Sequence, residues 1–181
     1  RDRKKYALRL LIFACISQIP DWLVMQPVYG WWTSNVIFTL FFGLLSIVAW
    51  ESDKKKWQKI LLIVLCHAAT VLIMSDWLIF GVLFILFIHI FRERPKARLI
   101  SYTVIAAIWQ IIAIISNGIT DVKVWTDSLL RFAVVMLAYF CVTVLCSGKK
   151  GKHPVFSKWF FYIFYPLHYL IIFAVFKLIP Q

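Results

Sequence analysis

Long apolar stretches separated by short charged clusters run along the whole chain. Seven stretches reach or approach the roughly 20 mostly apolar residues that a helix needs to cross a hydrocarbon core of ~30 Å. They are residues 6–25, 35–50, 59–75, 77–91, 99–116, 129–147 and 159–179. They lack the alternation of polar and apolar positions typical of membrane β-barrel strands. The pattern predicts an all-α, polytopic membrane helical bundle with about seven spans in this chain, the second and fourth of them short.

The composition agrees with a membrane protein. Of the 181 residues, 62% are hydrophobic and 15% are charged, against the roughly 25% charged residues usual in soluble domains. These values exclude a disordered tail and an ordinary soluble enzyme. The net charge of +12 would suggest nucleic acid as a partner, but the basic residues lie in clusters between apolar stretches. We therefore expect membrane lipids and not nucleic acid as partners. Without internal repeats, residues 1–181 are predicted to form a single transmembrane domain.

The basic clusters predict the orientation of the spans. They precede the first stretch and follow the second, fourth and sixth, at residues 1–5, 54–59, 92–98 and 149–158. Because Lys and Arg are enriched in cytoplasmic loops, these connections are predicted to be cytoplasmic, with the C-terminus on the opposite side. The connection 20–34, on that outer side, is predicted to be a long aromatic loop. The chain opens Arg-Asp-Arg-Lys-Lys without a methionine, so we expect the natural protein to have a further N-terminal part.

Ionisable groups inside a membrane are expensive, which makes each of them a candidate site. His168 is the strongest candidate, because it lies about 14 Å past Trp159 along a helix. Pro166 cannot donate a hydrogen bond to the Tyr162 carbonyl, and we expect a kink that opens space beside the histidine. His168 can then act as a general base. A packing histidine bonded to a neighbouring helix is an equally good interpretation.

The other candidates have weaker support. His67 stands beside small residues that favour close helix packing, so a structural role is favoured over ligand binding. Arg9 can snorkel to the cytoplasmic face or hold an anionic ligand there. Asp76 lies at a tight outer turn, where a carboxylate can hold a cationic group. The four cysteines lack metal-site spacing, so no metal is predicted. The basic clusters can steer a polyanionic donor, although topology alone also explains them.

Four motifs in this chain resemble those of the TraX family of integral membrane proteins. They are Arg9-Leu10 with Phe13 and Ser17-Gln18-Ile19-Pro20; Asn35-Val36-Ile37-Phe38-Thr39-Leu40 with Gly43; Ser75-Asp76-Trp77 with Gly81; and Phe164-Tyr165-Pro166-Leu167-His168. The motifs occur in the family's order and extend over nearly the whole chain. One motif alone would be weak in an apolar sequence, but the four together are fairly specific.

The resemblance implies an acetyltransferase of the bacterial inner membrane, with acetyl-CoA as donor and no metal. The founding member of the family acetylates a pilin subunit, so the implied acceptor is a pilin-like or other secreted peptide. Family members have two further upstream spans with an Asp-His pair, which would bring the full-length protein to about nine spans. On the matched motif positions we expect three catalytic residues. His168 is the general base or the orienter of the acceptor nucleophile, and Asn35 donates to the oxyanion or to the acyl carbonyl. Asp76 holds the acceptor ammonium or orients a histidine. Arg9, Gln18, Tyr165 and His67 are the predicted substrate-binding residues.

Two other functions compete with this one. A non-catalytic assembly or scaffold protein of a conjugation or secretion system would have much the same sequence. A transporter subunit is disfavoured, because only Pro166 interrupts a span deeply and no half of the chain matches another. The sequence predicts neither the acceptor's identity nor the oligomeric state.

Overall fold

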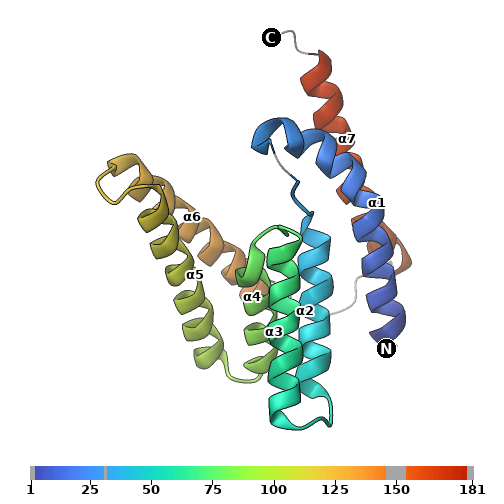
Figure 1. Cartoon of the computed structure of the whole chain (residues 1–181), viewed down its shortest axis with the longest axis vertical. Coiled ribbons are helices and arrows are strands. Elements are labelled where there is room, and N and C mark those ends of the chain that lie inside the picture. The colour runs from blue at the N-terminus through green and yellow to red at the C-terminus, as the bar shows by residue number, and fades with distance from the viewer. Residues whose placement is uncertain (1–2, 31, 146–153, 179–181) are drawn as a thin grey trace. The chain divides into compact units, whose positions relative to one another are not determined.

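A computed structural model describes residues 3–30, 32–145 and 154–178, and helices joined by short connections make up these ranges (Figure 1). The helices are α1 (Arg3–Tyr29), α2 (Val36–Glu51), α3 (Lys56–Leu72), α4 (Leu78–Ile90), α5 (Pro95–Asn117), α6 (Val122–Phe140), the short π-helix η1 (Cys141–Leu145) and α7 (Pro154–Leu178). Each predicted span corresponds to one α-helix. The all-α prediction is therefore confirmed.

The helices form two compact units. The first contains α1, α2, α3, most of α4 and α7, and the second contains the end of α4 with α5, α6 and η1. In the first unit α2 packs against both α3 and α1, and α7 packs along α1 (Figure 1). All the candidate site residues lie on the first unit. The prediction of a single transmembrane domain stays a prediction.

Four helical segments in the described ranges are long and apolar enough to cross a membrane. They are Arg3–Val28, Pro95–Asn117, Val122–Val144 and Trp159–Leu178. The helices α2 and α4 are apolar but shorter, as predicted for the second and fourth spans. Together with the composition, these segments identify the chain as a multi-pass membrane protein.

Large apolar side chains point outward and small or polar side chains point inward. Leu72 is 83% exposed and Phe161 70% exposed, whereas Ser46 and Thr70 are fully buried. This distribution suits a lipid environment, where helices associate through small residues and side-chain hydrogen bonds. The glycines illustrate the close contact of α2 with α4. A Cβ atom on Gly81 would overlap the Thr39 methyl group, and one on Gly43 would overlap Ile85.

The first helix is longer than the sequence predicted. We expected a span at 6–25 and an aromatic loop at 20–34, but α1 continues through Pro20 and Pro27 to Tyr29. The loop prediction was therefore wrong for residues 20–29. A proline removes a single N–H donor from a helix, and a long helix in a membrane retains its remaining backbone hydrogen bonds. The extension carries Asp21 into the helix and keeps its side chain buried.

In the second unit, α5 and α6 form a hairpin held together by aromatic and polar contacts. The rings of Tyr102 and Tyr139 lie 4.7 Å apart between centroids. The Tyr102 hydroxyl donates to the Val135 carbonyl at 3.4 Å, and Arg98 Nε donates to the Tyr139 hydroxyl at 3.3 Å. These contacts join α5 to α6 without involving any predicted site residue.

Candidate functional site

Asn35 connects α1 to the start of α2. It is the N-cap of α2, where its Oδ1 accepts from the Ile37 N–H at 3.0 Å. Its Nδ2 donates to the Ala14 carbonyl at 2.9 Å and to Gln18 Oε1 at 3.0 Å. Gln18 Nε2 in turn donates to the Thr33 carbonyl at 2.7 Å. Both donors of the Asn35 amide are engaged, so an oxyanion role would require one of these bonds to be exchanged.

The connection that precedes α2 pairs with the turn between α3 and α4. Ser34 and Ser75 form an isolated parallel β-bridge. The Ser34 N–H donates to the Met74 carbonyl, and the Asp76 N–H donates to the Ser34 carbonyl, both at 3.0 Å. The Thr39 hydroxyl bonds both the Ser75 hydroxyl and the Asp76 carbonyl. Motifs that are 40 residues apart in sequence therefore meet in one buried polar network.

The α3–α4 turn is strained. Three non-glycine residues have positive φ angles, namely Met74 at 49°, Trp77 at 65° and Leu78 at 42°. Backbone of this kind persists only where the surroundings hold it in place, and it is enriched at functional sites. The turn holds the half-buried Asp76 carboxyl next to the network described above. Burial raises the pKa of the Asp76 carboxyl above its usual value.

His168 lies on a face of α7 that also carries two tyrosines. Its imidazole is half-exposed, stacks on Phe164, and lies 4.3 Å from the Tyr169 ring between centroids. Its Nδ1 bonds the Phe164 carbonyl at 3.2 Å. Because a carbonyl can only accept, Nδ1 carries the proton and Nε2 carries the lone pair. The imidazole therefore has the tautomer that a general base acting through Nε2 requires. The helix α7 is continuous through Pro166.

Asp21 is the residue that sequence reasoning missed. Its side chain is 2% exposed, and its Oδ1 is buried without a hydrogen-bond partner. The Tyr169 hydroxyl lies within hydrogen-bonding range, and both Asp76 and His168 are close enough to interact with it electrostatically. We define the Asp21 cluster as Asp21, Asp76, Tyr165, His168 and Tyr169. An aspartate next to a tryptophan near a predicted span end suggests a solvated interface, and no sequence signal contradicted that expectation.

A cavity of about 520 Å³ lies between α1, α2 and α7, next to the Asp21 cluster. Its lining is aromatic and aliphatic, with Tyr6 and Leu10 from α1, Val36 from α2, and Tyr165 from α7 among the residues. The Tyr165 hydroxyl is buried and lies close enough to the Tyr169 hydroxyl to interact with it. Tyr165 therefore belongs to both the cavity lining and the Asp21 cluster, and its role in substrate binding stays a prediction. His168, Asn35 and Asp76 do not line this cavity.

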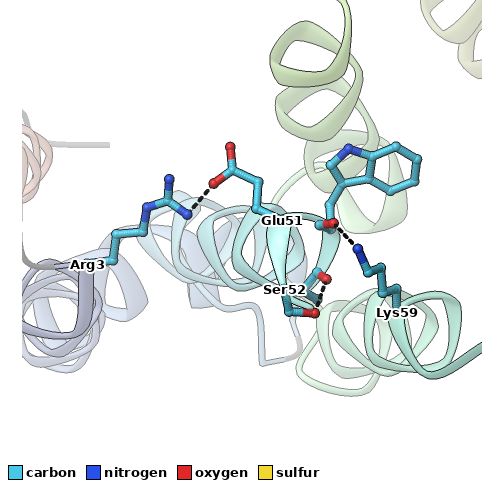
Figure 2. A network of polar contacts seen from close by, with 6 residues as sticks. Arg3, Glu51, Ser52 and Lys59 are labelled. Carbon is cyan, nitrogen blue, oxygen red and sulfur yellow. Dashed lines mark hydrogen bonds and ion pairs between the residues drawn. The ribbon is translucent and has the colours of Figure 1, made fainter. Parts of the chain in front are cut away.

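The opposite end of the first unit is basic. Figure 2 shows Arg3 paired with Glu51. The Lys59 ammonium donates to the Trp50 carbonyl at 3.1 Å. A cleft of about 450 Å³ in this region is lined by Trp50, Lys54, Lys56, Lys59 and Ile60. Its three lysine side chains give the cleft a positive charge that suits an anionic ligand.

Two further predicted residues lie apart from the Asp21 cluster. His67 bonds its own helix through Nδ1 and the Ile63 carbonyl at 2.7 Å, and its Nε2 is buried without a partner. The Arg9 guanidinium lies over the Tyr6 ring, 5.9 Å from the centroid, and therefore near the wall of the cavity. In the described part of the chain, no three His, Cys, Asp or Glu residues lie close enough to hold a metal ion.

Comparison with known families supports the motif resemblance. A family model described as "TraX protein" matches residues 1–176. The chain belongs to the TraX family. This TraX-family protein is also 29% identical to "Probable fimbrial assembly protein FimC, serogroup H1" of Dichelobacter nodosus, over 93% of this chain and 70% of that protein. No solved structure matches it.

Proposed function

We propose that this protein is a membrane-embedded acetyltransferase that moves an acetyl group from acetyl-CoA to an amine, such as a pilin-like N-terminus. The observation that carries the proposal is His168, whose Nδ1 is fixed on a carbonyl and whose Nε2 is left as a base beside Asp21. A nearby carboxylate stabilises the imidazolium that forms when such a base takes a proton. Membership of the TraX family supports the choice of donor and acceptor.

The reaction balances with these groups. The His168 Nε2 takes a proton from the acceptor ammonium, and the freed amine nitrogen forms a bond to the thioester carbonyl carbon. The C–S bond then breaks, the nitrogen loses its second proton, and the coenzyme A thiolate takes up one proton. The products are an amide, the thiol and one released proton. The oxyanion of the tetrahedral intermediate needs a donor, and Asn35 can serve if its Nδ2 exchanges the bond to Gln18.

The donor is proposed to bind at the basic cleft. Coenzyme A carries several phosphate charges, which suit the lysines at positions 54, 56 and 59. The helix α2 has 16 residues and is therefore about 24 Å long, which separates the cleft from Asn35. The cavity between α1, α2 and α7 occupies part of that distance. The extended arm of the donor would lie along this cavity, with Arg9 and Tyr165 near its wall.

We further propose that the basic end faces the cytoplasm of a bacterial cell and that the Asp21 cluster lies toward the outer face of the inner membrane. The positive-inside rule supports this orientation. It would place the donor on the side where acetyl-CoA is made and the acceptor on the side where pilins and other secreted peptides are assembled.

An assembly or scaffold protein is the second candidate. It is favoured by the network around Asn35, in which both side-chain donors of Asn35 and the Gln18 amide are already engaged, as expected of a structural joint. The name of the Dichelobacter nodosus relative, a probable fimbrial assembly protein, is compatible with either function. A scaffold requires neither a general base at His168 nor a cleft that binds acetyl-CoA.

Label transfer from acetyl-CoA distinguishes the two functions. Membranes containing the protein, with any residues that precede Arg1 in its gene, are incubated with radiolabelled acetyl-CoA, and label on co-purifying peptides is measured. Replacement of Lys54, Lys56 and Lys59 together by alanine should raise the KM for acetyl-CoA at least fivefold. The control Lys123→Ala should leave the KM unchanged, because Lys123 lies on the second unit. Absence of transfer by the folded wild type would favour the scaffold.

A further inference from the structure

The buried carboxyl group of Asp21 has no positively charged partner in the described part of the chain. Its carboxyl is 2% exposed, its Oδ1 has no partner, and a second carboxylate, Asp76, is close enough to repel it. No Lys or Arg in the described part of the chain forms an ion pair with it. Two carboxylates in a poorly solvated site are stable together only when a proton or a cation offsets their charge. A bound cation would satisfy both carboxylates and the free lone pairs of Oδ1.

Asp21 also lies between two cavities along the α1–α7 contact. The inner cavity is lined by Leu10 on α1 and Tyr165 on α7. The outer cavity, of about 330 Å³, is lined by Leu23 on α1 and Phe173 on α7. Asp21 precedes Leu23 by two residues, and Tyr169 lies one helical turn from both Tyr165 and Phe173. Along α1 and α7 (Figure 1), Asp21 and Tyr169 therefore lie between the residues that line the inner cavity and those that line the outer one.

We propose that Asp21 binds the primary ammonium group of an amphiphilic amine, whose apolar chain occupies the outer cavity. Asp21 Oδ1 accepts one N–H of the ammonium. Asp76 adds a second negative charge, and the buried Tyr165 hydroxyl, which lies close to the Tyr169 hydroxyl, has an oxygen that can accept another N–H. The aromatic rings of Tyr165 and Tyr169, 5.3 Å apart between centroids, supply faces that attract a cation.

The composition of the site favours an ammonium over a metal ion. The described ranges contain no group of three or more His, Cys, Asp and Glu side chains that could hold a metal ion. The outer cavity is lined mainly by apolar residues, including Val24, Pro27 and Phe176, which suit an alkyl or apolar peptide chain. Its one cation, Lys177, lies two helical turns beyond Tyr169 and over the Phe173 ring. Lys177 therefore lies at the far end of the cavity from Asp21.

The identification of the bound amine as the acetyl acceptor rests on the proposed function. The binding of an ammonium group at Asp21 does not, because binding requires no acetyl transfer. The probe is n-hexylammonium, and binding to the purified protein in lipid nanodiscs is followed by calorimetry, with empty nanodiscs subtracted. Two matched probes separate charge from shape: hexanol has the same chain without the charge, and tetramethylammonium has the charge without N–H donors. We expect saturable binding of n-hexylammonium and at least tenfold weaker binding of both matched probes.

The matched variants are Asp21→Asn, which removes the charge with little change of shape, and Asp127→Asn, which removes a carboxylate from the second unit. We expect Asp21→Asn to weaken n-hexylammonium binding at least tenfold and Asp127→Asn to change it less than twofold. Equal binding by wild type and a folded Asp21→Asn variant would overturn the proposal.

A second measurement uses the wild type and so does not depend on the folding of a variant. A diazirine-bearing alkylamine is photolysed in the nanodiscs, and the labelled peptides are identified by mass spectrometry. Label on the segments around Asp21 and Tyr169 that n-hexylammonium competes away supports the site, and label confined to other helices refutes it.

If acetyl transfer persists while the Asp21→Asn variant binds n-hexylammonium normally, this assignment fails and the proposed function stands. If binding depends on Asp21 and no transfer occurs, the proposed function fails alone.

Discussion

Asn35 binds Gln18 twice at a single atom, because the backbone N–H and the side-chain Nδ2 of Asn35 both donate to Gln18 Oε1, at 3.1 and 3.0 Å. The contact lies where α1 meets the start of α2, and neither side chain has more than 8% exposure. A fully satisfied polar joint of this kind fixes the register of two helices in an environment without water to replace its bonds.

Replacement of Asn35 by alanine should therefore destabilise the protein strongly. The variant loses the side-chain N-cap of α2 and the two buried Nδ2 hydrogen bonds to the Ala14 carbonyl and to Gln18 Oε1, while the backbone N–H at position 35 still donates to Gln18 Oε1. Loss of the cap and of two buried hydrogen bonds together is expected to lower the free energy of unfolding by about 3 kcal/mol. Denaturant unfolding in mild detergent, followed by circular dichroism, measures the change.

Asn117→Ala is the matched control, because Asn117 is exposed and bonds only its own helix, through the Ala113 carbonyl at 2.7 Å. Its effect should stay below about 1 kcal/mol. If the two variants were equally stable, the network around Asn35 would not be the joint described above.

The seven α-helices of the described ranges were predictable because each contains a continuous apolar stretch. The α3 and α4 helices, at Lys56–Leu72 and Leu78–Ile90, begin and end within three residues of the predicted spans. The length of α1 was not predictable, because Pro20 and Pro27 are strong signals for a loop in a single sequence. In the fold the rest of α1 packs against α7, and this tertiary contact outweighs the local signal.

Because α2 and α4 lie close together, an added methyl group at Gly81 should destabilise the protein, and removal of the facing methyl group of Thr39 should reverse this loss. Gly81→Ala places a Cβ against the Thr39 Cγ2, and overpacking of this kind costs about 1–3 kcal/mol of unfolding free energy. Thr39→Ser removes that methyl and keeps the hydroxyl that bonds Ser75. The double variant should therefore recover most of the stability lost by Gly81→Ala.

Thermal unfolding of the two single variants and the double variant measures this recovery. Additive losses, with the double variant less stable than either single variant, would show that Gly81 and Thr39 do not share the contact.

Ionisation of the Asp76 carboxyl should make the stability of the protein depend on pH. Because burial raises the pKa of its carboxyl above 3.8, the folded state binds more protons than the unfolded state at pH values above that value. Stability contributed by this group is therefore greatest at low pH and falls as the pH rises through the raised pKa. Asp76→Asn should be more stable than the wild type at neutral pH and lose this advantage as the pH falls.

The comparison is made by measuring Tm between pH 4 and 8. The hydrogen bonds of Asp76 to Ser34 and Thr39 use its backbone, so asparagine preserves them. A difference in Tm that stayed constant across this range would contradict the assignment of the pH dependence to Asp76.

The candidate site was predictable where its residues lie in motifs and unpredictable where tertiary contacts create it. Tyr165 and Asp76 were identified from the sequence, and the structure places them in one cluster with His168. Asp21 was not identified, because its burial depends on the continuation of α1 past Pro20 and on the packing of Tyr169 from α7. No periodicity within one segment reports a contact between residues that are 148 positions apart in the chain.

The most direct test of the central claim compares two histidine variants in the acetyl-transfer assay. His168→Gln keeps a side chain of similar polarity but provides no base, whereas His89→Gln changes a histidine on α4 that is outside the Asp21 cluster. If His168 is the base, label transfer from acetyl-CoA should fall about 100-fold or more in His168→Gln and stay within twofold of wild type in His89→Gln. Transfer at the wild-type rate by folded His168→Gln protein would contradict the account.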